Sequence, residues 1–252
     1  MTLTVHNLNY LSESIRELYG LGFRSFSIIP DADCGTWTQD TFREYESQMD
    51  QVIGFWHAQR DISVNTIDQV MRKLVTKREP SHLCQAGKHI VGITIHGDIY
   101  PCHDFAGRYA SNPVERAALV IGNVMTGFTK KQHEYADLRI DETVKPDTGY
   151  DCKTCWAKWV CSRGCPYMNY ASSHDIRRVN ATYCMTTRIN ASLAMRWMSV
   201  LDDFRFASAK TDGRTDTPRG AERGIAEEMQ RSNYPTTHNR GERQRTPMIP
   251  AQ

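Results

Sequence analysis

Cysteine is the residue type whose number and spacing in this chain point most directly to chemistry. Seven of the eight cysteines form one ordered series, C-x12-G-x4-C, then C-x2-C-x5-C-x3-C and a last cysteine, with gaps between the three parts. The members are Cys84, Cys102, Cys152, Cys155, Cys161, Cys165 and Cys184, and the glycine is Gly97. Thiolates bind soft metals and iron–sulfur clusters. Because seven soft ligands are too many for one ion, the series predicts two metal centres.

This spacing resembles that of the SPASM domain, the C-terminal cluster-binding module of radical S-adenosylmethionine (SAM) enzymes that modify ribosomally made peptides and proteins. The match extends from Cys84 to Cys184. The resemblance implies two auxiliary [4Fe–4S] clusters held by thiolates. By position, it assigns the outer cluster, farther from the active site, to Cys152, Cys155, Cys161 and Cys184. It assigns the inner cluster to Cys84, Cys102 and Cys165.

The inner set departs from the family pattern. Members with a fully cysteine-ligated inner cluster have a further cysteine a few residues after the first, whereas here the segment reads Cys84-Gln-Ala-Gly-Lys-His89-Ile. Three alternatives remain for the fourth position: it is open to substrate, it is filled by His89 or His96, or the cluster is smaller.

Zinc and disulfides are the other common uses of closely spaced cysteines. Seven cysteines without a clear histidine partner do not divide into tetrahedral sets of four, which favours clusters over zinc. The start, MTLTVHNLNYL, lacks the basic and apolar segments of a secretion signal, so a cytoplasmic protein without disulfides is expected. No apolar run is long enough to span a membrane. With 31 basic and 29 acidic residues, the net charge of +2 gives no indication of a nucleic-acid partner.

Composition divides the chain into residues 1–80, 81–206 and 207–252. The first region predicts strands at 3–5 and 25–29, each followed by a helix with an apolar stripe, the second along residues 42–56. This order predicts an α/β fold. By resemblance it corresponds to the C-terminal portion of a partial (β/α) barrel, so the chain is expected to begin within that domain. The loop after the second strand contains Asp31, Asp33 and Cys34, which either border a substrate or are ordinary loop residues.

The second region predicts a small, loop-rich α+β cluster domain that contains a β-hairpin. His96-Gly97-Asp98 separates two apolar runs, and Gly97 supplies the positive φ that a tight turn needs. Residues 119–124 predict a further strand. Aromatic residues near the second cysteine group are expected to shield a cluster from water, to pack as core, or both; they are Trp156, Trp159, Tyr167 and Tyr170.

Two predictions concern the end of the chain. A helix is expected after Cys184, packed on the barrel or on the cluster domain, from the spacing of Ile189, Leu193, Trp197, Leu201 and Phe204. Residues 207–252 contain almost no large apolar side chain, so this tail is expected to be disordered.

His103 and Asp104 follow Cys102 directly. In the sulfatase-maturating branch of the family, an aspartate after the corresponding cysteine accepts the substrate proton. An imidazole at that position can do the same work, with Asp104 orienting it. The alternative is a pair that hydrogen-bonds the cluster sulfurs or the loop backbone. The change from aspartate to histidine argues against sulfatase maturation itself.

The C-x3-C-x2-C motif that binds the catalytic cluster of radical SAM enzymes is absent. The nearest string, Cys161-Ser-Arg-Gly-Cys165-Pro-Tyr-Met168, has methionine in the third position. The chain is therefore expected to be the C-terminal part of a longer enzyme and not to cleave SAM alone. One hypothesis is the cluster-binding end of a maturase, with a peptide or protein substrate and an electron donor protein as partners. The other is a non-catalytic zinc or iron–sulfur module that binds a peptide or protein.

Overall fold

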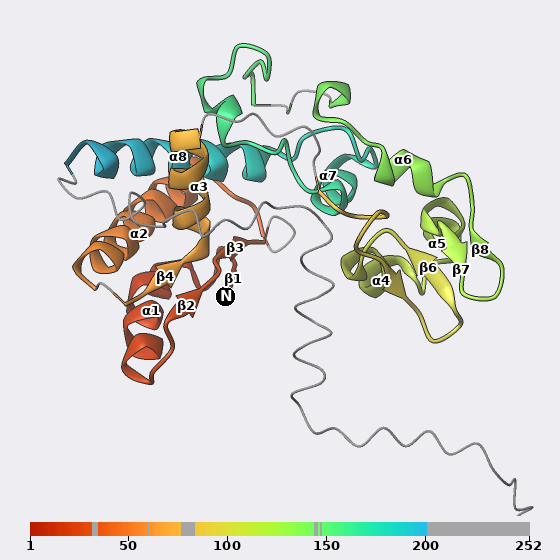
Figure 1. The fold of residues 1–252 in the computed structure, drawn as a ribbon, viewed down its shortest axis with the longest axis horizontal. Helices are drawn as coiled ribbons and strands as arrows, with labels where there is room; N and C mark the ends of the chain where they lie inside the picture. The colour runs from red at the N-terminus through yellow and green to blue at the C-terminus, as the bar shows by residue number, and fades with distance from the viewer. Residues whose placement is uncertain (32–34, 60, 77–83, 144–145, 147, 201–252) are drawn as a thin grey trace, which may run out of the picture. The chain divides into compact units, whose positions relative to one another are not determined.

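The structure is a computed structural model that describes residues 1–31, 35–59, 61–76, 84–143, 146 and 148–200 (Figure 1). All of them belong to one compact unit, Met1–Phe204. The predictions for residues 207–252 lie outside the described part of the chain. None of the helices described is both long and apolar enough to cross a membrane.

The N-terminal elements alternate short strands with helices. They are β1 (Thr2–Leu3), the 3-10 helix η1 (Leu8–Tyr10), α1 (Leu11–Gly20), β2 (Ser25–Phe26), β3 (Ile29–Pro30), α2 (Gln39–Ala58), β4 (Ser63–Val64) and α3 (Asn65–Thr76). β1 pairs with β3 and β2 pairs with β4, both in parallel. Parallel pairs connected by helices are the basic unit of α/β folds. The prediction of an α/β region is confirmed at this level.

The strand predicted at residues 25–29 is instead two strands with different partners. The break falls at Ile28, where the side chain of Thr66 takes the place of a strand partner. Its Oγ1 accepts from the Ile28 N–H at 3.2 Å and donates to the Ile28 carbonyl at 3.0 Å. The apolar pattern reported the buried stretch correctly, but pairing across it depends on a residue 38 positions away.

Helix α2 begins with a capping box, in which Thr38 and Thr41 each accept a hydrogen bond from the other's backbone N–H. Its buried stripe contains Tyr45, Met49, Val52, Ile53 and Trp56, as the helical spacing predicts. The C-terminal helix α8 (Ala181–Val200) packs on α2 and α3, as expected (Figure 1). Tyr45 donates to Asn190 Oδ1 at 3.0 Å and Trp197 Nε1 donates to Asp50 Oδ1 at 2.7 Å. Leu201 and Phe204, also predicted for this helix, lie outside the described residues.

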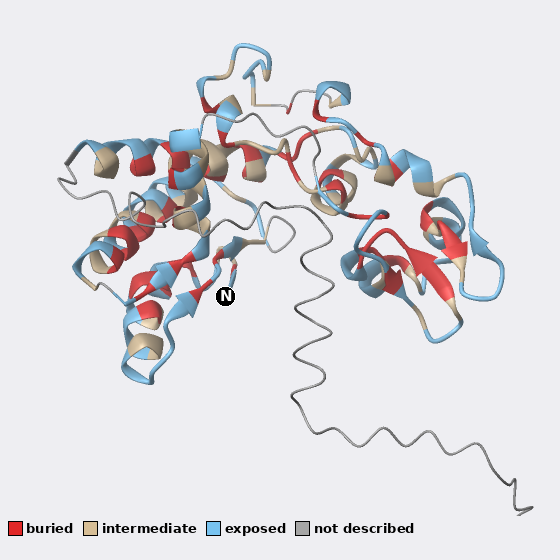
Figure 2. Ribbon diagram, viewed as in Figure 1, coloured by how far each residue is buried: buried red, intermediate tan, exposed pale blue. Residues whose placement is uncertain are grey.

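The remaining elements contain a four-stranded antiparallel sheet in the order β5-β6-β7-β8. They are β5 (Gly92–Ile93), β6 (Asp98–Tyr100), α4 (His103–Tyr109), α5 (Pro113–Leu119), β7 (Gly122–Asn123), β8 (Gly127–Phe128), α6 (Gln132–Ala136), the 3-10 helices η2 (Ile140–Glu142) and η3 (Trp156–Trp159), and α7 (Pro166–Ser173). β6 is buried along its whole length (Figure 2).

The predicted hairpin is present. β5 and β6 pair antiparallel, Gly97 has φ +81°, and its N–H donates to the Thr94 carbonyl at 2.9 Å. The strand predicted at 119–124 is wrong at its start, because Leu119 ends α5. The Asn112 side chain caps that helix by accepting from the Val114 and Glu115 N–H groups, so the apolar run begins as a helix and only 122–123 pair as a strand.

The aromatic residues near the cysteines divide into two kinds. Tyr167 and Tyr170 are partly buried and pack in a core with Phe105, Tyr109 and Tyr135. Trp156 and Trp159 are 45% and 39% exposed, so the expectation that they shield a cluster from water is wrong for much of their surface. They lie on η3, a single short turn that presents their rings to solvent.

Candidate metal centres

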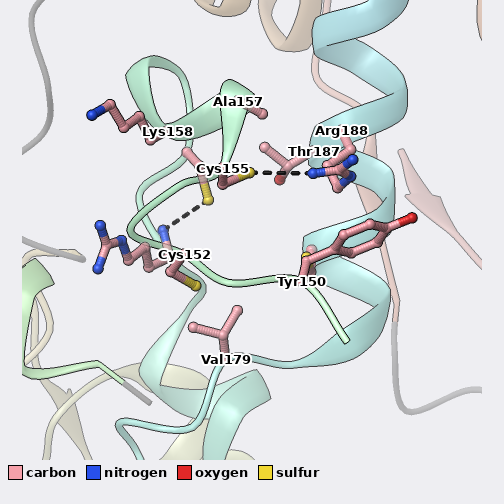
Figure 3. A pocket seen from close by; sticks show the side chains of 11 residues that line it. Tyr150, Cys152, Cys155, Ala157, Lys158, Val179, Thr187 and Arg188 are labelled. Atoms are coloured by element: carbon pink, nitrogen blue, oxygen red, sulfur yellow. Dashed lines mark hydrogen bonds between the residues drawn. The ribbon is translucent and has the colours of Figure 1, made fainter. Parts of the chain in front are cut away.

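Four cysteines line one cavity. Cys152, Cys155, Cys161 and Cys184 border it together with the side chains of Tyr150 and Arg188 (Figure 3). We refer to these four residues as the four-thiol site. All are free thiols. They are the residues that the resemblance assigns to the outer cluster.

Separate elements carry the four thiols. Cys155 is the N-cap of η3, and Cys161 follows the end of that turn. Cys184 lies in the first turn of α8, where the Asn180 carbonyl accepts its N–H at 3.0 Å. The Asn180 side chain also accepts from the Tyr183 N–H at 3.0 Å, which caps the helix start. The helix end therefore fixes one ligand direction, while loops supply the other three.

Hydrogen-bond donors and cations surround these sulfurs. The Arg163 backbone N–H donates to Cys161 Sγ at 3.2 Å, and Arg188 Nη1 donates to Cys155 Sγ at 3.3 Å. Burial raises the pKa of the Cys161 thiol to about 11, and the neighbouring thiols of the site raise it further. Burial also raises the pKa of Cys152 and Cys184. Metal-free thiols here hold their protons, and binding of a metal centre would release them.

Cys84, Cys102 and Cys165 form the second group, the three-thiol site. Burial raises the pKa of Cys165 to about 11, and the nearby thiols of Cys84 and Cys102 add to this. Burial likewise raises the pKa of Cys102, with Asp104 and Cys84 adding to it. Cys84 is exposed, and its sulfur accepts from the Ala86 N–H at 3.2 Å. These are the residues that the resemblance assigns to the inner cluster.

Two of the three thiols stand at helix starts. Cys102 is the N-cap of α4, and Cys165 is the N-cap of α7, which has Pro166 in its first turn. The backbone N–H groups of each first turn lower the pKa of the adjacent thiol against the effect of burial. A helix N-terminus stabilises a thiolate, so both positions suit anionic sulfur ligands.

An aromatic core holds these two helix starts together. The Phe105 ring on α4 meets the rings of Tyr167 and Tyr170 on α7 with centroids 5.6 and 6.0 Å apart. Tyr109 adds an edge contact to Tyr170 at 5.6 Å. Because Phe105 is fully buried, its position fixes α4 against α7 and so Cys102 against Cys165.

One short turn joins the two sites, since Cys161 belongs to one and Cys165 to the other. Arg163 and Gly164 both have positive φ, +56° and +101°. A Cβ at Gly164 would overlap the side chain of Asn169, which is fully buried. Asn169 Nδ2 donates to the Ile176 carbonyl at 3.0 Å, and its Oδ1 accepts from the Asn180 N–H at 2.9 Å. The glycine therefore lets the turn approach the residue that anchors the start of α8.

The structure separates the histidines considered as a fourth ligand. His96 is exposed in the hairpin turn, at the opposite end of β6 from Cys102. His89 is exposed in the turn after Cys84. Among the described residues, the group whose ligand atoms lie within 4.8 Å of one another is Cys102, His103 and Asp104, which has the donor types of a metal site.

His103 and Asp104 also border a cavity of about 700 Å³ together with Cys165 and Asp31. The cavity adjoins the ends of β3 and β4, at Pro30 and Asn65. His103 Nε2 lies 3.3 Å from Asp104 Oδ1, and the His103 side chain is 82% exposed. The predicted contact between base and orienting carboxylate is present, while a role in proton transfer stays a prediction. Asp33 and Cys34 lie outside the described residues.

Three cationic residues at these sites were not singled out from the sequence. Arg163 and Arg188 contact the four-thiol site, and Lys73 borders the large cavity and donates to the Val160 carbonyl at 3.2 Å. Burial lowers the pKa of Lys73. Arg188 follows Cys184 by four residues, so helical spacing alone could have indicated that both lie on one face.

The comparisons with known proteins identify one fold relative. A solved structure titled "Native anSMEcpe with bound AdoMet" is similar to this chain, with a TM-score of 0.55 and 14% sequence identity. The match covers 81% of this chain and 56% of that chain, so this chain spans just over half the length of that protein. The fold is similar to that of a radical SAM enzyme. No family model and no curated protein matches the sequence.

Proposed function

We propose that this chain binds two iron–sulfur clusters and forms the SPASM portion of a radical SAM enzyme that modifies a ribosomally made peptide or protein. The observation that carries the proposal is the grouping of seven thiols into a four-thiol site and a three-thiol site. The likeness in fold to a protein with bound AdoMet supports the same family.

The four-thiol site fits a [4Fe–4S] cluster in its donor set. Each iron of such a cluster takes one thiolate, and the cavity has four free cysteines around it. A cluster with four thiolates is anionic, and Arg163 and Arg188 place N–H donors on two of the sulfurs. When bound, clusters of this kind accept and pass single electrons.

The three-thiol site fits a cluster that has one position free for another ligand. Its sulfurs lie at two helix starts and a surface turn, and Cys165 borders the 700 Å³ cavity. We place the peptide or protein substrate in this cavity, where Asp31, Lys73 and Asp104 offer polar contacts. His103, with Asp104 beside it, would accept a proton from the substrate.

The role of this chain is therefore substrate binding and electron transfer. Because its sequence contains no C-x3-C-x2-C segment, we do not expect the chain to cleave SAM by itself. A full-length enzyme would supply that segment with its own cluster. An electron donor protein and a cytoplasmic location belong to the same proposal, because reduced clusters are kept in reducing compartments.

Anaerobic reconstitution with iron and sulfide tests the proposal. We expect roughly eight irons and eight labile sulfides per chain, four of each for a cubane cluster. Electron paramagnetic resonance of the reduced protein should show two cluster signals. Stoichiometric zinc without labile sulfide would instead leave a non-catalytic binding module.

A further inference from the structure

Arg188 occupies a specific position over the four-thiol site. It lies on α8 one turn after Cys184, and its Nη1 donates to Cys155 Sγ at 3.3 Å (Figure 3). The guanidinium carbon lies 3.7 Å from the centroid of the Tyr150 ring and 5.1 Å from that of Trp156. The two rings therefore hold the charged group while it donates to the sulfur.

The other cations of this cavity are placed differently. The Arg163 guanidinium donates to the Ile140 carbonyl at 3.0 Å and to Thr143 Oγ1 at 3.4 Å, so it is the backbone of Arg163 that contacts sulfur. The Lys158 ammonium lies 4.9 Å from the Trp159 ring. Both residues line the cavity, but Arg188 combines a full charge with a side-chain hydrogen bond to a thiol.

Arginine is suited to this position because its guanidinium stays charged at all physiological pH values and is planar enough to stack on a ring. Charge-assisted hydrogen bonds are stronger than neutral ones. A donor fixed on a ligand sulfur stabilises negative charge there, and hydrogen bonds to cluster sulfurs are one of the means by which proteins set cluster potentials.

We propose that Arg188 sets the reduction potential of the centre at the four-thiol site by stabilising its reduced state through the hydrogen bond to Cys155. This inference rests on the proposed function, because it requires a cluster at that site. Reduction adds one electron, taken from an external reductant such as dithionite, and the added negative charge is met by the guanidinium. Tyr150 and Trp156 act by keeping the guanidinium in place.

The test is a redox titration of the reconstituted protein, followed by electron paramagnetic resonance, with the three-thiol site as internal reference. R188M removes both charge and donor and should lower the potential of one cluster by about 59 mV, a tenfold change for a one-electron couple. K158M removes one positive charge from the same cavity without removing a donor to sulfur, and should change the potential much less. The signal of the second cluster should stay unchanged in both variants.

R188Q provides a second variant if R188M does not retain its iron. It keeps an N–H donor and loses the charge, so a smaller shift in the same direction is expected. Unchanged potentials in a fully loaded Arg188 variant would overturn the proposal, as would equal shifts in R188M and K158M. Absence of iron and labile sulfide from the unchanged protein would instead overturn the proposed function itself, so the two failures are distinguishable.

Discussion

The four-thiol site and the three-thiol site are built in different ways. In the first, loops, η3 and α8 bring four sulfurs around one cavity, and two arginines donate to them. In the second, two sulfurs stand at the starts of α4 and α7, the third is exposed, and Cys165 borders a cavity of about 700 Å³. The first arrangement suits a fully ligated centre that exchanges electrons, and the second suits a centre that meets a substrate.

The two sites also depend on different parts of the core. The relative position of α4 and α7 rests on the aromatic rings around Phe105, whereas Cys184 is tied to α8, which packs on α2 and α3. Damage to one part of the core should therefore affect one site more than the other. The turn between Cys161 and Cys165 is the exception, since it serves both.

Phe105→Ala should have the largest effect. Removing a fully buried ring costs about 3–5 kcal/mol of unfolding free energy and loosens α4 against α7. We expect selective loss of iron from the three-thiol site, with the four-thiol site loaded in the molecules that fold. Denaturant unfolding and iron analysis measure both effects. Phe128→Ala, at a ring that is 51% exposed, serves as the control and should leave iron content unchanged. Iron lost equally from both sites would contradict the separation of the two cores.

Gly164→Ala should affect both sites together. The new Cβ would overlap the Asn169 side chain, and the residue would be held at φ +101°, so a loss of about 1–3 kcal/mol is expected. Gly107→Ala is the matched control, because open space surrounds its Cβ position on helix α4. Thermal unfolding and iron content should change for the first variant and not fall for the second. A Gly164 variant that loses iron from one site alone would show that the turn does not couple them.

The metal-free chain should lose stability at alkaline pH. The Cys161 thiol has a pKa of about 11 when folded, against roughly 8.5 unfolded. Between these values the unfolded chain has released its proton and the folded chain has not, so the free energy of unfolding falls as the pH rises. Because the thiol is only partly buried, we expect its share to be on the order of 1 kcal/mol. Denaturant unfolding at pH 8 and pH 10 should show a shallower decline for Cys161→Ser, and equal slopes would contradict this account.

Local patterns predicted the elements that local forces control. The stripe on α2 and the positive φ of Gly97 both follow from spacing and residue type within one element. The strand at residues 25–29 was wrong because Thr66, far along the chain, divides it, and Leu119 was misplaced because the cap at Asn112 extends α5. The order of the cysteines led to the same two groups that their surroundings in the structure describe. Their role as cluster ligands stays a prediction.

The hydrogen-bond donors of the sites could not be read from cysteine spacing. Arg163 contacts Cys161 through its backbone N–H, a contact that depends on positive φ and carries no residue-type signal. Arg188 reaches Cys155 from another element, 33 positions away in sequence. The exposure of Trp156 and Trp159 likewise follows from the shortness of η3, which no composition rule indicates.

The most direct test of two separate centres is the iron content of Cys155→Ala, Cys102→Ala and the double variant after anaerobic reconstitution. The account predicts that each single change removes roughly half of about eight irons, four per cluster, and that the double change removes nearly all of them. The two single variants should retain different electron paramagnetic resonance signals, one from each site. Loss of all iron from either single variant in a folded protein, or the same remaining signal in both, would contradict the assignment of these cysteines to two centres.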